Sequence, residues 1–143
     1  MENRVERSQN DFGRKWLAKG KEALGRGRLS EAIENLKRAI EVDSQSIEAH
    51  LDLGIALAID AQVYQAIDVF EATLALSPKD FIVNFKLAEL YFRLGVPEKG
   101  HKYLQTAMEA CSTVPERQLL RTLKSQEAER EKRRIYRPTF VKS

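Results

Sequence analysis

Apolar residues recur three or four positions apart along most of the chain, which is the spacing of one face of an α-helix. The same arrangement returns every 34 residues, so that residues 13–46, 47–80 and 81–114 align as three similar units. Small residues hold the eighth and twentieth places of each unit, and large apolar residues hold the twenty-fourth. These are Gly20, Gly54 and Ala88, then Ala32, Ala66 and Gly100, and finally Leu36, Phe70 and Leu104. Small residues let neighbouring helices approach closely, so each unit is predicted to be an antiparallel helix pair.

Glycine and proline mark the expected helix ends. Gly27 and Gly95 stand where the first helix of a unit must stop, because glycine accepts the backbone conformation that terminates a helix. Pro97 can open the next helix, and Ser77 and Pro78 close the second unit. The pattern therefore predicts an all-α protein.

These units resemble the tetratricopeptide repeat, whose signature sets Trp, Leu-Gly, Tyr, Ala, Phe, Ala and Pro at fixed places. The matching residues are Trp16 and Gly20 in the first unit, Leu53, Gly54, Ala66, Phe70 and Pro78 in the second, and Leu87, Ala88, Tyr91, Gly95 and Ala107 in the third. The departures from the signature are Lys19, Ala23, Ser44 and Ser112. The resemblance implies a right-handed superhelical solenoid of three antiparallel helix pairs followed by a C-terminal helix.

The flanking segments complete the expected organisation. We expect the chain to be divided into an N-terminal arm (residues 1–12), three repeats (13–114), a capping helix (115–134) and an extended tail (135–143). A solenoid must shield the apolar flank of its last unit, and Leu119, Leu120 and Leu123 give the capping helix an apolar stripe. The stripe stops at Lys124, so we expect the polar remainder of that helix to project or fray.

Composition narrows the class of protein. The 143 residues are 43% hydrophobic and 31% charged, which is typical of a soluble globular chain. Cys111 is the only cysteine, so no intrachain disulfide can form. The longest apolar run, residues 53–59, is far shorter than the ~20 residues of a membrane span, and the N-terminus is charged. We expect a cytoplasmic protein.

Charge is unevenly distributed along the chain. Residues 1–28 and 121–143 carry net charges of +4 and +5, whereas residues 29–120 carry −6. Basic ends can attract nucleic acid, but no aromatic residues are interleaved with a basic stripe, as single-strand binding requires. We therefore consider nucleic acid an unlikely partner.

The sequence offers little for catalysis. His50 and His101 lie in different units and, together with Cys111, lack the spacing of a metal site. No glycine-rich loop follows a predicted strand, so a phosphate cradle is not expected either. We predict a protein that is not an enzyme and that uses no metal or cofactor.

The resemblance implies that positions 2, 5, 9, 12 and 13 of each first helix line a concave groove. The predicted lining is Leu17, Lys21 and Leu24 from the first unit, Glu48, Leu51, Ile55 and Ile59 from the second, and Ile82, Phe85, Glu89, Phe92 and Arg93 from the third, with Arg14, Gly25 and Ala58 at the remaining places. Eight of these side chains are large and apolar, more than a surface open to water normally carries, and such patches usually mark binding sites. The alternative is that some of them face neighbouring helices.

The groove residues also decide between two kinds of ligand. In this family a carboxylate clamp of Lys, Asn and Arg side chains holds acidic C-termini of chaperones. The corresponding positions here are Leu17, Lys21, Asp52, Ile82 and Lys86, so the clamp is essentially absent. An apolar groove instead favours an amphipathic helix or an apolar peptide, oriented by charges at its rim.

Two functions therefore remain in view. The first is a protein–protein interaction module, an adaptor or small chaperone that holds an apolar segment of another protein. Three repeats and a cap around an apolar groove are similar to small secretion chaperones that shield hydrophobic translocator segments. The second is a homo-oligomer, a self-associating scaffold in which the tail segment 135–141 occupies a groove of its own or a neighbouring chain.

Overall fold

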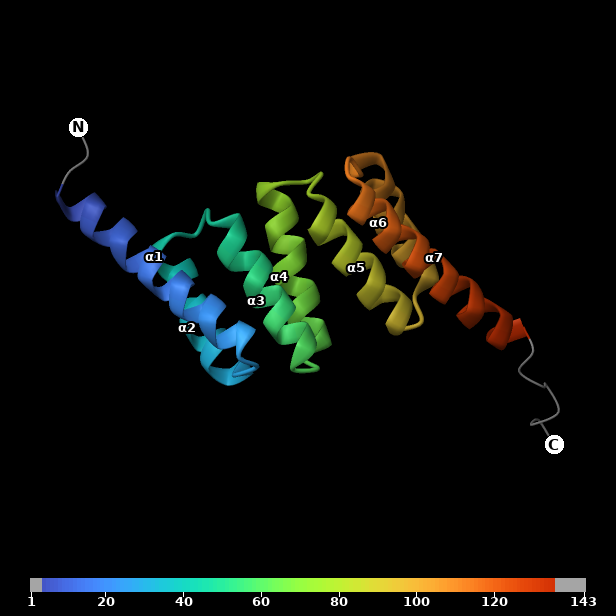
Figure 1. Cartoon of the computed structure of the whole chain (residues 1–143), viewed down its shortest axis with the longest axis horizontal. Helices are drawn as coiled ribbons and strands as arrows, with labels where there is room; N and C mark the ends of the chain where they lie inside the picture. Colours follow the sequence, from blue (N-terminus) through green and yellow to red (C-terminus); the bar gives the residue numbers. More distant parts are fainter. Residues whose placement is uncertain (1–3, 136–143) are drawn as a thin grey trace.

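The structure, a computed structural model, describes residues 4–135, and the side chains of residues 11–134. Within that range it contains seven α-helices and no strand. The helices are α1 (Arg4–Gly25), α2 (Leu29–Val42), α3 (Ile47–Ile59), α4 (Val63–Leu76), α5 (Phe81–Arg93), α6 (Pro97–Ala110) and α7 (Val114–Ile135). The three pairs follow one another along the long axis, and the two termini lie at opposite ends of the molecule (Figure 1). The predicted all-α solenoid of three helix pairs and a C-terminal helix is confirmed.

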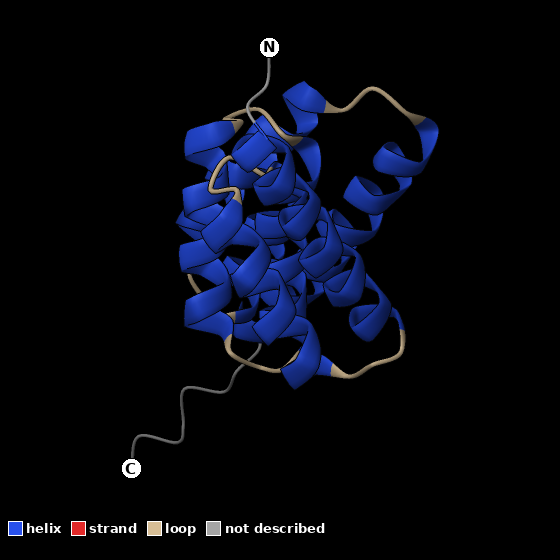
Figure 2. Ribbon diagram, turned by 90° about the vertical axis from the view of Figure 1, so that its left-hand side faces the viewer, coloured by secondary structure: helices blue, strands red, loops and turns tan. Residues whose placement is uncertain are grey.

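Short loops join the helices (Figure 2), and local chemistry fixes where each helix begins. The side chains of Ser46 and Asp80 accept hydrogen bonds from the amides of Ala49 and Val83, at 3.2 and 3.0 Å, and so cap α3 and α5. Pro97 occupies the first turn of α6, as predicted. The two side-chain caps thus fix where the first helices of the second and third pairs begin.

The turn inside each pair needs one residue in the left-handed conformation. Gly27 and Gly95 adopt it with φ of +74° and +75°, which confirms the predicted helix ends. In the second pair the same place is held by Ala61, with φ of 63°. A side chain is disfavoured in that conformation, because its Cβ approaches the following carbonyl oxygen.

Glycines also allow the two helices of a pair to touch. A Cβ added to Gly54 would lie 2.4 Å from the ring of Phe70, and one added to Gly20 would lie 2.6 Å from Leu36. In the third pair the close approach is between Gly100 and Phe92. The small-residue positions of the repeat are therefore the places where helix meets helix.

The buried side chains form two clusters. The first joins the first two pairs to one side of α5 through residues such as Leu36, Phe70 and Leu87. The second lies between α5, α6 and α7, and includes Leu120 and Leu123. The core thus runs the length of the solenoid, and α7 closes its C-terminal end.

The helices at the two ends of the solenoid, α1 and α7, are longer than the sequence pattern indicated. Helix α1 already begins at Arg4, so most of the predicted arm of residues 1–12 is helical. Helix α7 does not fray after Lys124 but continues to Ile135, and Glu127 is only 3% exposed, so the expected fraying is wrong. The remainder of the expected tail, residues 136–143, lies outside the described residues.

Candidate peptide-binding groove

The predicted groove residues lie on α1, α3 and α5, and the structure gives their apolar members three different environments. Leu17, Leu24, Leu51 and Ile55 are half-buried against the first core cluster. Ile82 is half-buried against the second cluster. Ile59, at the C-terminal end of α3, is 61% exposed. Each of these side chains therefore keeps some surface free for a ligand.

Phe85 and Phe92 were expected on the open surface and are instead buried, at 6% and 1% exposed. Both belong to the second cluster together with Leu120 and Leu123 of α7. Gly100 brings α6 close to the ring of Phe92, whose centroid lies 5.0 Å from that of His101. The expectation that they form open lining is wrong for this structure, because packing in the third pair covers them.

Charged groups bridge α1 and α3 across the predicted groove. The Nζ atom of Lys21 lies 2.6 Å from Glu48 and 2.9 Å from Asp52. These contacts raise the pKa of Lys21, first through Asp52 and then through Glu48. The ammonium group is thus held between two carboxylates where the first two repeats meet. From the sequence, Asp52 was identified only as a departure from the carboxylate clamp and was missed as a partner of Lys21. Its position four residues after Glu48, on the same face of α3, was the feature that could have indicated this role.

The third repeat carries a separate set of charges. Lys86 lies 3.5 Å from Glu89, and both side chains are partly exposed. Arg93 is exposed at the last position of α5. Of the predicted charged residues, Lys21 and Glu48 are therefore in contact, whereas Glu89 and Arg93 belong to the other end of the surface.

The histidines and the cysteine are not gathered into a site. Nδ1 of His50 lies 2.8 Å from the carbonyl oxygen of Ser46, within one helical turn. His101 packs against Phe92, and Cys111 ends α6. Among the described residues there is no group of three or more His, Cys, Asp or Glu side chains arranged to hold a metal ion. None of the helices described reaches the length and apolar character that crossing a membrane requires.

Comparison with known proteins finds a family match over part of the chain. Residues 20–58 match the model of the family described as TPR repeat. No protein with a curated description matches the chain in sequence.

Several solved structures share the fold. The type III secretion translocator chaperone SycD of Yersinia enterocolitica superposes with a TM-score of 0.75 at 21% identity, over 88% of this chain and 96% of that one. SycD in complex with a peptide of the translocator YopD superposes with a TM-score of 0.74 at 20% identity, over 85% of this chain and 92% of SycD. YrrB, described as a TPR protein with an unusual peptide-binding site, gives 0.71 at 22% identity, over 87% of this chain and 58% of YrrB.

The matched segment extends from the first pair into the helix that opens the second, where the signature residues Gly20 and Gly54 make the close helix contacts. The fold shared with the solved structures extends over 88% of the chain for SycD and 87% for YrrB. Residues 20–58 therefore match the TPR repeat, and the chain as a whole has the fold of such repeats, with three helix pairs and a C-terminal helix.

Proposed function

We propose that the protein is a non-enzymatic interaction module, an adaptor or small chaperone, which holds an apolar segment of another protein in the groove formed by its first helices. One observation carries the proposal: the apolar side chains at the groove positions of α1 and α3 remain partly exposed. Ile59 is the clearest case, because 61% of its surface is open. Soluble proteins seldom leave a row of large apolar side chains uncovered unless a partner covers them.

The arrangement of charge supports an apolar rather than an acidic ligand at this place. Lys21 already has two carboxylate partners, Glu48 and Asp52, so its charge is neutralised within the protein. A ligand at the junction of α1 and α3 therefore meets half-buried leucine and isoleucine beside an ion cluster of one lysine and two carboxylates, whose net negative charge disfavours an acidic ligand. Removing apolar surface from water would supply most of the affinity, at about 25 cal/mol for each Å² covered.

The fold of the similar structures is compatible with this role. SycD is a translocator chaperone whose structure is also known in complex with a peptide of YopD, and YrrB is a TPR protein with an unusual peptide-binding site. At these identities the likeness extends to the fold, and the proposal for this chain depends on its own exposed residues.

The test is a selection of displayed random peptides on the wild-type protein, followed by binding measurements on variants. We expect selected peptides to carry two or three large apolar residues and to lose affinity for Ile59→Glu by roughly tenfold, because the substitution places a charge beside the bound apolar segment. Tyr64→Glu is the matched control, since Tyr64 is 74% exposed on α4 and outside the predicted groove.

Both variants must first show wild-type helicity by circular dichroism. Peptides that bind Ile59→Glu as well as wild type, or that lose as much affinity on Tyr64→Glu, would count against the groove. Phe85 is unsuitable for this test, because a charge at its buried position would disrupt the second core cluster.

A further inference from the structure

A pocket lies at the C-terminal end of the solenoid, where the last turn of α5 faces the second half of α7. Here Arg93, Leu94 and Gly95 from the end of α5 and the turn after it, together with Phe92, form one wall of a pocket of about 530 Å³. Arg130, Arg133 and Arg134 of α7 form the other wall. Four of the seven lining residues are thus arginines from two separate helices.

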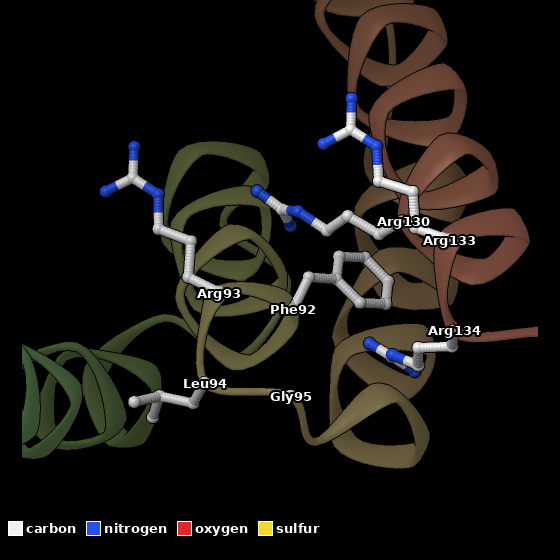
Figure 3. A pocket seen from close by; sticks show the side chains of 7 residues that line it. All are labelled: Phe92, Arg93, Leu94, Gly95, Arg130, Arg133 and Arg134. Atoms are coloured by element: carbon white, nitrogen blue, oxygen red, sulfur yellow. The ribbon is translucent and has the colours of Figure 1, made fainter. Parts of the chain in front are cut away.

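Arginine side chains from both helices surround the ring of Phe92. Figure 3 shows Arg93, Arg130 and Arg133 reaching out on one side of the Phe92 ring, and Arg134 on its other side. Phe92 is itself buried, so its ring is not an exposed platform. An anion entering between α5 and α7 would therefore meet guanidinium groups from both helices.

One buried carboxylate holds part of this set in place. Glu127 is 3% exposed, and its Oε1 and Oε2 atoms lie 3.6 Å from Arg134 and 3.7 Å from Arg130. It is the only acidic side chain paired with any of the four arginines among the described residues. The pocket therefore keeps an excess of three positive charges, and Glu127 positions two of the arginines before any ligand arrives.

The buried ion pair of Glu127 and Arg130 lacks a hydrogen bond. Nη1 of Arg130 and Oε2 of Glu127 are both buried and lie 3.7 Å apart, and neither atom has a hydrogen-bond partner within the described part of the chain. Glu127 therefore holds Arg130 through charge rather than through a hydrogen bond. Arg93 and Arg133 are exposed, and neither has an ion-pair partner in that part.

We propose that this arginine pocket binds carboxylate groups of an acidic segment of a partner protein. Guanidinium groups match carboxylates in geometry and form paired, charge-assisted hydrogen bonds with them. A nucleic-acid strand fits less well, because single-strand sites need exposed aromatic rings for stacking and the ring of Phe92 is covered. The pocket differs from the family's carboxylate clamp, because three of its four arginines belong to the C-terminal helix α7.

The test measures binding of a rhodamine-labelled peptide of consecutive glutamates, flanked by glycines, by fluorescence anisotropy on the full-length protein. A glutamine peptide of equal length is the control ligand. The Arg93→Gln/Arg133→Gln variant removes the two pocket arginines that are not paired with Glu127, so both ion pairs of Glu127 are kept. We expect it to weaken binding at least roughly tenfold. The matched control, Arg117→Gln/Arg121→Gln, removes the same charge from exposed positions elsewhere on α7, and we expect it to stay within about twofold of wild type.

Equal losses in the two double variants would show general attraction to a basic surface and would overturn the proposal. So would tighter binding of an oligothymidylate, or competition by inorganic phosphate as effective as that by the glutamate peptide. The probe has no apolar residue, so the result is independent of the groove formed by α1 and α3.

Discussion

Substituting alanine for Gly54 tests the packing that holds the second repeat together. The new methyl carbon would lie 2.4 Å from Cε1 of Phe70 and 2.7 Å from two further ring atoms, where about 3.4 to 4 Å is ordinary contact. Phe70 is completely buried in the first core cluster, so the ring must move by about 1 Å against its neighbours. Overpacking of this kind costs about 1 to 3 kcal/mol, whereas alanine gains about 1 kcal/mol over glycine inside a helix. We expect a net loss of up to about 2 kcal/mol.

The assay is urea unfolding followed by far-ultraviolet circular dichroism, with Gly25→Ala as the matched control. A Cβ at Gly25 has nothing within 4 Å, so that variant keeps the helical gain without the clash. In a Phe70→Leu background the Gly54→Ala substitution should cost at least about 1 kcal/mol less, because the two residues are in contact. If Gly54→Ala were as stable as Gly25→Ala, the close approach of α3 and α4 would be refuted.

Two further predictions concern single residues. Ala61→Gly should stabilise the protein by about 0.5 to 1 kcal/mol in the same unfolding assay, because glycine relieves the strain of the left-handed conformation at φ of 63°. Part of that gain is lost because glycine raises the conformational entropy of the unfolded chain. A variant less stable than wild type would contradict this prediction. Burial, followed by the 2.8 Å hydrogen bond that its hydroxyl donates to Glu71, raises the pKa of Tyr91 to about 12 from its ordinary value near 10. The stabilising contribution of the neutral hydroxyl should therefore be complete below pH 10 and be lost as the pH rises towards 12. The pKa of Tyr103 is also raised, by burial and by Glu71, so an alkaline absorbance titration should show more than one late tyrosine. The step near pH 12 should be lost in Tyr91→Phe, and its persistence in that variant would refute the assignment.

Much of the fold could be predicted because close helix packing requires small residues at regularly spaced positions of the sequence. Small residues at Gly20, Gly54 and Gly100 are required wherever helices touch, and they gave the repeat its phase. Gly27 and Gly95 marked two of the three internal turns, whereas Ala61 carried no such mark. The third turn was located only through the repeat, since residue type alone does not identify an alanine forced into a left-handed conformation.

The groove was harder to predict. Residue spacing shows which side chains share one face of a helix, but it does not show whether another helix packs over that face. Phe85 has the same place in its unit as Leu17 and Leu51, yet the third unit has α7 beside it and Phe85 is buried. The sequence also placed Glu127 in solvent. It lies four residues after Leu123 on the same face of α7, so the apolar stripe continues in space through a buried carboxylate paired with arginines.

The distribution of exposed side chains has a consequence for the kind of partner that would satisfy both proposed sites. The open apolar positions belong mainly to α1 and α3, because packing with α6 and α7 has covered Phe85 and Phe92 of α5. The uncompensated positive charge lies at the end of α5 and on α7. A segment bound to both would therefore carry its apolar residues at one end and its carboxylates at the other, and the two ends would contribute differently to binding. Salt should weaken the acidic end strongly and the apolar end little, because screening acts on exposed charges and not on apolar contact.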